Sequence, residues 1–340
     1  MDFLLSDEQS QIVDTLKTFL TSQAPVARFR PPARQIGNDD HRLCLELGAL
    51  GYLGITIGDA QGGIGLSALE EMLAYREFGR HLVSPVVLAL GMAARMAAHA
   101  NSDLLDDLLK GSTRVALANP LGAVHLGQEC QGDVHLIDGR DAEWVIISDI
   151  DGAALLPREA FSDVIDVPAM DHLLTLQRAR LIRARPQLWA AAADDPVHRR
   201  AQLLLAAYAV GMSEATRDMA VDYAKNRQQF GKPIGAFQAI KHICADMAIR
   251  SEAALCQVIF AALVQSDAAA GEDFHGVAAK LVAVDAALKN AGQNIQVHGA
   301  IGFTAEADAH VYLKRAHVVE QLWGNTRQLR ERMLAADFPD

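Results

Sequence analysis

The sequence predicts a mainly α-helical protein with a small β-domain in the middle of the chain. Residues 1–118 are rich in Ala, Leu and Glu, and residues 196–340 return to long stretches with helical apolar spacing. Between them, residues 119–195 contain short apolar runs separated by Asp-Gly turns, which is typical of a small antiparallel sheet. We therefore predict an N-terminal helical domain over 1–118, a middle β-domain over 119–195 and a C-terminal four-helix bundle over 196–340.

Single elements can be placed within this scheme. Residues 1–20 carry polar side chains every three or four positions, which predicts an amphipathic helix. The apolar runs 144–148 and 153–157, joined through Asp151-Gly152, predict two strands. A helical stripe is predicted further on, at Phe237, Ile240, Cys244 and Met247. The stretch 251–269 is apolar nearly all round, so we expect it to be buried in a bundle or at a subunit interface.

The composition excludes several classes of protein. With 340 residues, 51% of them hydrophobic, the chain can bury large cores. A net charge of −11 without a Lys/Arg cluster argues against nucleic acid as a partner. The N-terminal residues lack the pattern of a signal peptide, and apolar runs such as 83–98 are too short to span a membrane. A cytoplasmic protein without a membrane partner is therefore expected.

The cysteines and histidines give no sign of a metal site. The chain has four scattered cysteines, at Cys44, Cys130, Cys244 and Cys256. They show neither paired spacing nor a spacing to histidine that would hold a metal ion, so reduced and buried thiols are expected.

Two long motifs carry more information than the composition. They are NRQQFGKPIGAFQAIKHICADMA at 226–248 and QNIQVHGAIGFTAEADAHVYLKRA at 293–316. Together with SDEQ (6–9), GGIGLS (62–67) and EFGR (77–80), they resemble the acyl-CoA dehydrogenase family from one end of the chain to the other. The resemblance implies the three-domain arrangement predicted above, FAD as cofactor, an acyl-CoA substrate and an electron-transfer flavoprotein as acceptor.

The first motif offers residues suited to a dinucleotide. The guanidinium of Arg227 could bind a pyrophosphate through two parallel hydrogen bonds, and Phe230 could lie against an adenine face. The resemblance implies that both bind the FAD of a neighbouring subunit, together with Phe237 and Gln238. It implies a further set of contacts in the loop of the second motif, at Gln296, Gly299 and Ala300. A glycine in such a loop lets the backbone approach a ligand closely, and Ala300 replaces one of the family's glycines.

The last helix has a predictable start. Asn325 followed by Gln328 is a variant of the capping box, so a helix is expected to begin near Thr326. A helix N-terminus favours anions, and the resemblance implies that Thr326 and Gln328 bind FAD there. Simple capping without a ligand is the alternative.

The family's catalytic base is missing. The resemblance places Trp323, Gly324 and Asn325 on a Tyr-Glu-Gly stretch whose glutamate removes the α-proton of the thioester. Glycine has no group for this step, and loss of a general base costs on the order of 10²–10⁴ in rate. The family's other location for the base falls near Ala201, which also lacks a carboxylate. Glu320 and Glu214 are the two candidates for a relocated base.

The middle domain also departs from the family. Only Asn119-Pro120 is similar to the Thr-Glu-Pro loop that holds flavin and substrate, and the domain is short. A chain that keeps contacts to a neighbour's FAD and lacks its own base resembles the short subunit of actinobacterial steroid side-chain acyl-CoA dehydrogenases. That resemblance implies an α2β2 heterotetramer in which a longer homologous subunit supplies the glutamate. An active homotetramer with a relocated base, or a binding protein without activity, are the alternatives.

Overall fold

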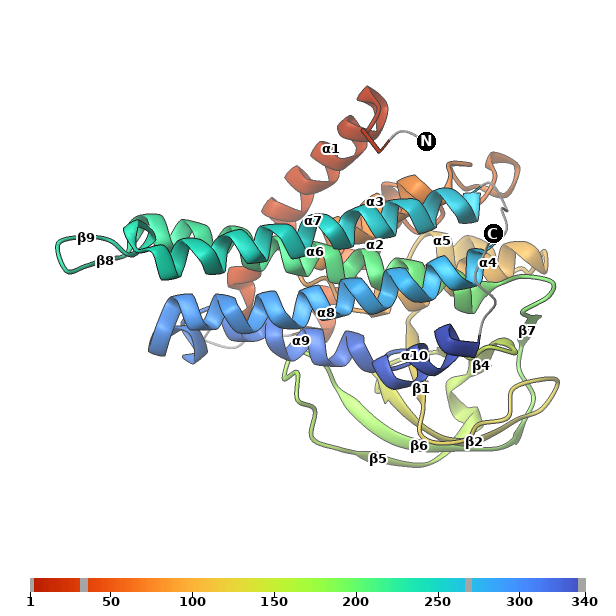
Figure 1. Ribbon diagram of the computed structural model, residues 1–340. Coiled ribbons are helices and arrows are strands. Elements are labelled where there is room, and N and C mark those ends of the chain that lie inside the picture. The colour runs from red at the N-terminus through yellow and green to blue at the C-terminus, as the bar shows by residue number, and fades with distance from the viewer. Residues whose placement is uncertain (1–2, 31–35, 267–270, 336–340) are drawn as a thin grey trace.

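The computed structural model describes residues 3–30, 36–266 and 271–335, and it places long helices above a curved sheet (Figure 1). The N-terminal third is helical, as predicted: α1 (Asp7–Gln23), α2 (Ile36–Ala49), α3 (Ala68–Arg80), α4 (Val86–His99) and α5 (Leu105–Leu109). Local chemistry fixes two of their starts, because Ser6 with Gln9 and Ser67 with Glu70 form capping boxes on α1 and α3. The amphipathic helix expected over 1–20 is α1, and Leu16 and Leu20 are its buried residues.

The middle of the chain forms one seven-stranded sheet with the order β5-β6-β2-β1-β3-β4-β7. Its strands are β1 (Val115–Pro120), β2 (Cys130–Ile137), β3 (Trp144–Ser148), β4 (Gly152–Pro157), β5 (Phe161–Asp166), β6 (Leu176–Ala184) and β7 (Leu188–Ala191). The two predicted runs are β3 and β4, which form a hairpin. The sheet is not wholly antiparallel, because β1 and β3 are parallel neighbours. After β2 the chain passes to the far side of β1 instead of returning beside β2, and this crossing makes β3 run parallel to β1.

Side chains on the two faces of the sheet enter different cores. Along β1, Val115 and Leu117 join the large core shared with the helices, whereas Ala116 and Ala118 join a second core bounded by the sheet itself. This alternation is the period of two that a strand requires. Because both faces are covered, β3 and β4 are buried along almost their whole length.

The C-terminal part is a bundle of long helices. They are α6 (Val197–Asn226), α7 (Gln238–Ser266), α8 (Glu272–His298) and α9 (Ala309–Gln321), followed by the shorter α10 (Thr326–Ala335). The small hairpin of β8 (Gln228–Gln229) and β9 (Lys232–Pro233) lies at one end of the bundle, and α10 lies nearer the other end, beside the sheet (Figure 1). The domain limits after residues 118 and 195 stay predictions.

The helix α7 confirms one expectation and corrects another. Ile240, Cys244 and Met247 of the predicted stripe pack with residues of α6 and α8. Among the described residues, α7 is long and apolar enough to cross a membrane, contrary to the expectation that the apolar runs are too short. A core helix of a bundle satisfies the same criteria, and α7 packs along α6 and α8. Its outward side includes Ile249, which is 67% exposed. Residues 267–269 of the predicted apolar stretch lie outside the described residues.

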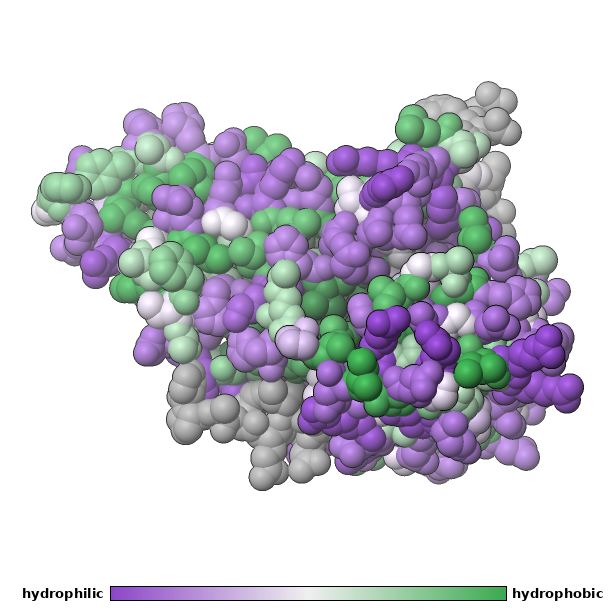
Figure 2. Space-filling model, turned by 90° about the horizontal axis from the view of Figure 1, so that it is seen from below, coloured by the Kyte–Doolittle hydropathy of each residue, from purple (hydrophilic) through white to green (hydrophobic). Residues whose placement is uncertain are grey.

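The prediction of buried thiols is met at Cys44 and Cys130, but Cys244 is only half-buried and Cys256 is exposed. All four cysteines are free, and Cys44 and Cys130 are buried. Cys256 is exposed, because it lies on the side of α7 that this single chain does not cover. No group of His, Cys, Asp and Glu that could hold a metal ion occurs in the part of the chain that the structure describes. Seen from below, the surface is mostly polar around the sheet, and hydrophobic residues are frequent along the bundle (Figure 2).

Candidate functional site

The predicted site residues fall into two groups at opposite ends of the molecule. One group surrounds the β8–β9 hairpin at the free end of the bundle, and the other surrounds the start of α10 (Figure 1). The helix α6 runs between the two regions. Gln202 lies near its N-terminus, and Arg227 follows its last residue directly. At 1.5 Å per residue, the helical path between these two residues is roughly 37 Å. One chain therefore cannot fold the two groups around a single ligand.

The hairpin end presents an exposed aromatic side chain in an unusual backbone conformation. Phe230 is 89% exposed and has a φ of 53°, which lies in the left-handed region that non-glycine residues rarely adopt. Its ring meets that of Phe237 edge to face at 6.1 Å, and the Lys232 ammonium lies 4.4 Å from the Phe237 centroid. The side chain of Arg227 is exposed and makes no hydrogen bond or ion pair with any residue the structure describes. No interaction with a described residue explains why the side chains of Phe230 and Arg227 are exposed.

At the same end of the molecule, the loop that follows α8 rests on packed side chains. His298 stacks on Tyr223 with centroids 4.1 Å apart, and its Nδ1 lies 2.8 Å from the carbonyl oxygen of Asn294. These contacts join the ends of α6 and α8. Gly299 has a φ of 64°, and an added Cβ there would meet nothing within 4 Å. The backbone of this loop is therefore open to solvent at Gly299. Four predicted site residues share this exposed surface, namely Gln238, Gln296, Gly299 and Ala300.

The other end contains an open crevice of about 780 Å³ between the sheet and the helices. Its walls come from the end of β1 at Asn119 and Pro120, the end of β3 at Ser148, and the N-terminal part of α6 at His198. The segment joining α9 to α10 supplies a further wall, at Trp323, Gly324 and Asn325. The predicted position of the missing base therefore does border a cleft. Neither Glu214 nor Glu320 lies in its lining.

The segment 322–326 is fixed from several sides. The buried amine of Lys280 on α8 donates hydrogen bonds to the carbonyls of Leu322 and Gly324, the latter at 2.7 Å. Burial lowers the pKa of Lys280 to about 7, although the nearby carboxylate of Glu320 opposes the shift. Trp323 has a φ of 47° and is 1% exposed. Its backbone N–H donates to Asn119 Oδ1 and its indole N–H to the carbonyl of Ala118, both at 2.8 Å.

Gly324 is constrained by its backbone as well as by its lack of a side chain. Its φ of 113° is a conformation that L-residues rarely adopt. An added Cβ would lie 3.2 Å from Gln202 Nε2 and 3.3 Å from Leu329 Cδ2. A carboxylate could therefore not be restored at this position without strain.

A serine and a histidine meet in the crevice, but their hydrogen bonds have the wrong direction for catalysis. The amide of Gln202 donates to Trp323 O at 3.0 Å, and its Nε2 lies 3.0 Å from His198 Nε2, which must then accept. The proton of His198 is thus on Nδ1, which faces Ser148 Oγ at 3.2 Å, and Ser148 donates to Gly152 O at 3.1 Å. Burial lowers the pKa of His198 to about 3. A neutral imidazole that donates to the hydroxyl cannot remove its proton.

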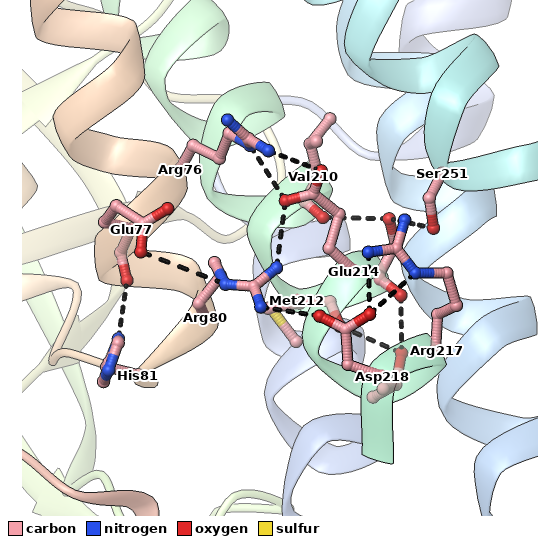
Figure 3. A network of polar contacts seen from close by, with 12 residues as sticks. Arg76, Glu77, Arg80, His81, Val210, Met212, Glu214, Arg217, Asp218 and Ser251 are labelled. Carbon is pink, nitrogen blue, oxygen red and sulfur yellow. Dashed lines mark hydrogen bonds and ion pairs between the residues drawn. The ribbon is translucent and has the colours of Figure 1, made fainter. Parts of the chain in front are cut away.

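The two candidates for a relocated base both have structural partners. Glu214 is 3% exposed and accepts two hydrogen bonds from Arg76, at 2.7 and 2.8 Å, and one from Arg80 at 3.2 Å (Figure 3). It lies twelve residues beyond Gln202 on α6, which is about 18 Å from the crevice wall. Glu320 accepts the Thr326 N–H at 3.0 Å and a bond from Gln321. The family's other base position, Ala201, is 0% exposed.

The capping box predicted at α10 is confirmed. The Asn325 N–H donates to Gln328 Oε1, and the Gln328 N–H donates to Asn325 Oδ1, each at 3.0 Å. The helix begins at Thr326, as predicted. Thr326 and Gln328 thus have internal hydrogen bonds that compete with their predicted role toward FAD.

Comparison with known proteins identifies the class. Residues 6–109 match the family model for the acyl-CoA dehydrogenase N-terminal domain, and residues 189–336 match the model for the C-terminal domain. The chain belongs to the acyl-CoA dehydrogenase family, a family of oxidoreductases. The whole architecture recurs in solved structures, among them the ChsE4–ChsE5 complex from Mycobacterium tuberculosis, with a TM-score of 0.82 and 21% identity over all of both chains. A variant of the steroid acyl-CoA dehydrogenase Tcur3481–Tcur3483 has a TM-score of 0.83 and 22% identity, and covers 97% of each chain.

Two curated relatives come from Mycobacterium tuberculosis. The acyl-CoA dehydrogenase FadE34 is 32% identical over 97% of this chain, which spans only 48% of FadE34. The acyl-CoA dehydrogenase IpdE2 is 29% identical, and the match covers 96% of both proteins.

Sequence reasoning missed the residues that hold the crevice together. His198, Gln202 and Lys280 come from helices that meet the 322–326 segment only in the folded chain. One local signal existed for Lys280, because it is the only charged residue between His275 and Asp285 in the sequence. A lone lysine in an apolar stretch is a candidate for a paired, buried amine.

Proposed function

We propose that this chain is the non-catalytic subunit of an FAD-dependent acyl-CoA dehydrogenase. In this proposal it binds part of a neighbouring subunit's FAD and leaves proton abstraction to that partner. The observation that carries the proposal is the separation of the two groups of site residues. An exposed arginine and aromatic ring lie at one end, and a crevice that has a glycine, Gly324, at the predicted position of the base lies at the other.

Each residue of the hairpin end has a proposed role. Arg227 binds the pyrophosphate through its guanidinium, and Phe230 packs against the adenine. Phe237, Gln238 and Gln296 border the same ligand, and the backbone at Gly299 and Ala300 approaches it closely. The guanidinium, which has no hydrogen bond or ion pair to a described residue, and the 89% exposed ring are what an FAD brought by another chain would cover. The bound FAD would supply the hydride acceptor for the dehydrogenation.

The substrate of the assembly is proposed to be a bulky acyl-CoA, a steroid side-chain ester in particular. The support comes from the solved steroid acyl-CoA dehydrogenase and the ChsE4–ChsE5 complex, which have this fold. The proposed assembly is an α2β2 heterotetramer with a longer homologous subunit, located in the cytoplasm, with an electron-transfer flavoprotein as acceptor. The internal partners of Glu214 and Glu320 weigh against an active homotetramer with a relocated base.

Co-expression tests this proposal. The chain and a longer acyl-CoA dehydrogenase encoded next to it are purified alone and together, and flavin absorbance and reduction of an artificial acceptor by a steroid acyl-CoA are recorded. We expect a yellow, active complex and an inactive isolated chain. Glu→Gln at the partner's base should abolish turnover. Gly324→Glu should leave it unchanged in the complex and create none in the isolated chain. Turnover by this chain alone would contradict the proposal, and a stable pair without activity would favour a binding protein.

A further inference from the structure

A second cavity lies beside the crevice, between the sheet and α9, and we call it the side chamber. It has a volume of about 200 Å³. Asn119 and Gln321 line both spaces, so these two residues separate the side chamber from the crevice. On the sheet, Asn119 of β1 lies opposite His135 of β2, on the face that meets the helices. The end of α9 forms the opposite wall.

Most of the wall of the side chamber is apolar and uncharged. Among the described residues of the lining there is no lysine or arginine. The one carboxylate in this described lining, that of Asp171, accepts a hydrogen bond from the buried guanidinium of Arg315, which neutralises its charge. The cavity is therefore suited to an uncharged ligand with an apolar body. The apolar lining residues are Ile137, Ala169, Met170, Leu174, Leu176, Val318 and Leu322.

Three polar groups in the side chamber have no hydrogen-bond partner in the part of the chain that the structure describes. The Trp323 N–H is a donor, so the Asn119 atom that it meets must be the oxygen, and the NH2 group of Asn119 is left over. The imidazoles of His135 and His317 also make no hydrogen bond with a described residue. Asn119 and His135 are half-buried, and polar groups withdrawn from water are normally paired. Their convergence on one cavity points to a ligand.

His135 is held in its neutral form. Burial lowers its pKa, and the charge of Arg178, its neighbour on β6, lowers the pKa further. A neutral imidazole has one donor and one acceptor nitrogen, whereas the Asn119 NH2 group only donates. Directly opposite residues of an antiparallel pair have Cβ atoms about 5 Å apart, so both side chains can reach one ligand oxygen.

We propose that the side chamber binds a compact ring compound whose keto or hydroxyl oxygen is held by the Asn119 amide and the His135 imidazole. The size of the cavity supports this class, because a cavity of roughly 150 Å³ holds benzene, so the side chamber can hold one ring or two fused rings. The site goes beyond the proposed function, since it requires neither FAD nor a partner subunit. Through Asn119, the ligand lies one side chain away from the backbone of Trp323.

Calorimetric titration of the full chain with 1-indanone, in the assembly in which the chain purifies, tests the proposal. 1-Indanone has two fused rings and a keto oxygen, and indane is the same body without the oxygen. Val318→Trp fills the side chamber from α9, and His135→Phe removes a hydrogen-bonding group at similar volume. The matched controls are Ile182→Trp and His99→Phe, which make the same changes at exposed positions outside the lining.

We expect 1-indanone to bind the unaltered chain saturably, and indane to bind about tenfold more weakly, the factor that 1.4 kcal/mol represents. His135→Phe should weaken the binding of 1-indanone about fivefold, within the range of one hydrogen bond. Val318→Trp should abolish this binding, and both controls should bind as the unaltered chain does.

Three results would each overturn the proposal: no saturable binding by the unaltered chain, equal affinities for the two compounds, or unchanged binding in both folded chamber variants. Circular dichroism checks that each variant folds. The comparison of indane with 1-indanone needs no variant, so the test still decides if Val318→Trp does not fold. Because the readout is binding to this chain and not turnover, its outcome is independent of whether the heteromeric dehydrogenase is found.

Discussion

At the scale of single residues, the arginine displayed at the end of α6 is the most direct test of ligand binding. Arg227→Ala should lower the FAD content of the purified complex, because truncating one partner of a close charge pair at an interface costs about 2–5 kcal/mol. Helix content should not change, since the exposed Arg227 side chain makes no hydrogen bond or ion pair with a residue the structure describes. The measurement is flavin absorbance per complex together with far-UV circular dichroism. The control is Arg185→Ala, because Arg185 is an exposed arginine near the sheet. An equal flavin content in both variants would show that Arg227 is an ordinary surface charge without a role in FAD binding.

Lys280 gives a second prediction at this scale, on pH. Its folded pKa of about 7 lies below the unfolded value of about 10.4. Between these two values the unfolded chain binds more protons, so this group makes the free energy of unfolding rise with pH. Lys280→Met should flatten that rise. It should also lower the free energy of unfolding at pH 7 by about 1–3 kcal/mol, because it leaves buried carbonyls unpaired.

Chemical denaturation of the full chain at several pH values measures both effects of the Lys280 substitution. Lys289→Met is the matched control on the same helix, since that lysine is 59% exposed and pairs with Asp285. A pH slope that is unchanged in Lys280→Met would show that Lys280 does not titrate in this range.

At the scale of elements, α3 and α6 cross with their backbones in contact. A Cβ added to Gly211 would lie 1.8 Å from the carbonyl oxygen of Arg76, and one added to Gly79 would lie 1.9 Å from that of Tyr208. Beside this crossing, Arg80 bridges the helices to Glu214 and Asp218 (Figure 3). Only glycine permits so close an approach, and the ion pairs form because the helices are this close.

Substitution at this crossing should therefore be costly. Gly211→Ala should lower the free energy of unfolding by about 3 kcal/mol, at the upper end of overpacking costs, because backbone atoms cannot move aside. Gly292→Ala on α8 is the control, since its Cβ would meet nothing within 4 Å. That substitution should raise stability by about 0.5–1 kcal/mol, the helical advantage of alanine over glycine. Equal melting temperatures for the two variants would refute the argument.

Local chemistry made some elements predictable and left others open. The start of α10 follows from Asn325 and Gln328 alone, and the stripe ending at Met247 follows from helical spacing. The parallel pairing of β1 with β3 was missed, because no local pattern says on which side of β1 the chain returns. Of the crevice, the sequence predicted only that Gly324 stands where the family has its glutamate. Its hydrogen-bonded wall depends on Gln202 and Lys280, which lie 122 and 44 residues before Gly324.

At the scale of the whole molecule, the exposed side of α7 predicts an assembly. Ile249 is 67% exposed on α7, a helix that contains a long apolar stretch. Ile249→Asp should shift the co-purified complex from the proposed tetramer toward smaller species, because a charge would be buried at the contact. Light scattering after size exclusion measures the change. Ile182→Asp, at 63% exposure on β6, should leave the tetramer intact, and an intact tetramer in both variants would place the interface elsewhere.

The environment of Trp323 has an optical consequence. The chain contains three tryptophans, and Trp323 is buried while Trp144 and Trp189 are only partly covered. Since its indole N–H is bonded to the Ala118 carbonyl and water is kept away, its emission belongs to the short-wavelength side of the spectrum. Any movement that parts the bundle from the sheet would admit water and shift that emission to the red. Trp323 is therefore an intrinsic fluorescent reporter of the contact between the bundle and the sheet, and it can be read in solution without a label.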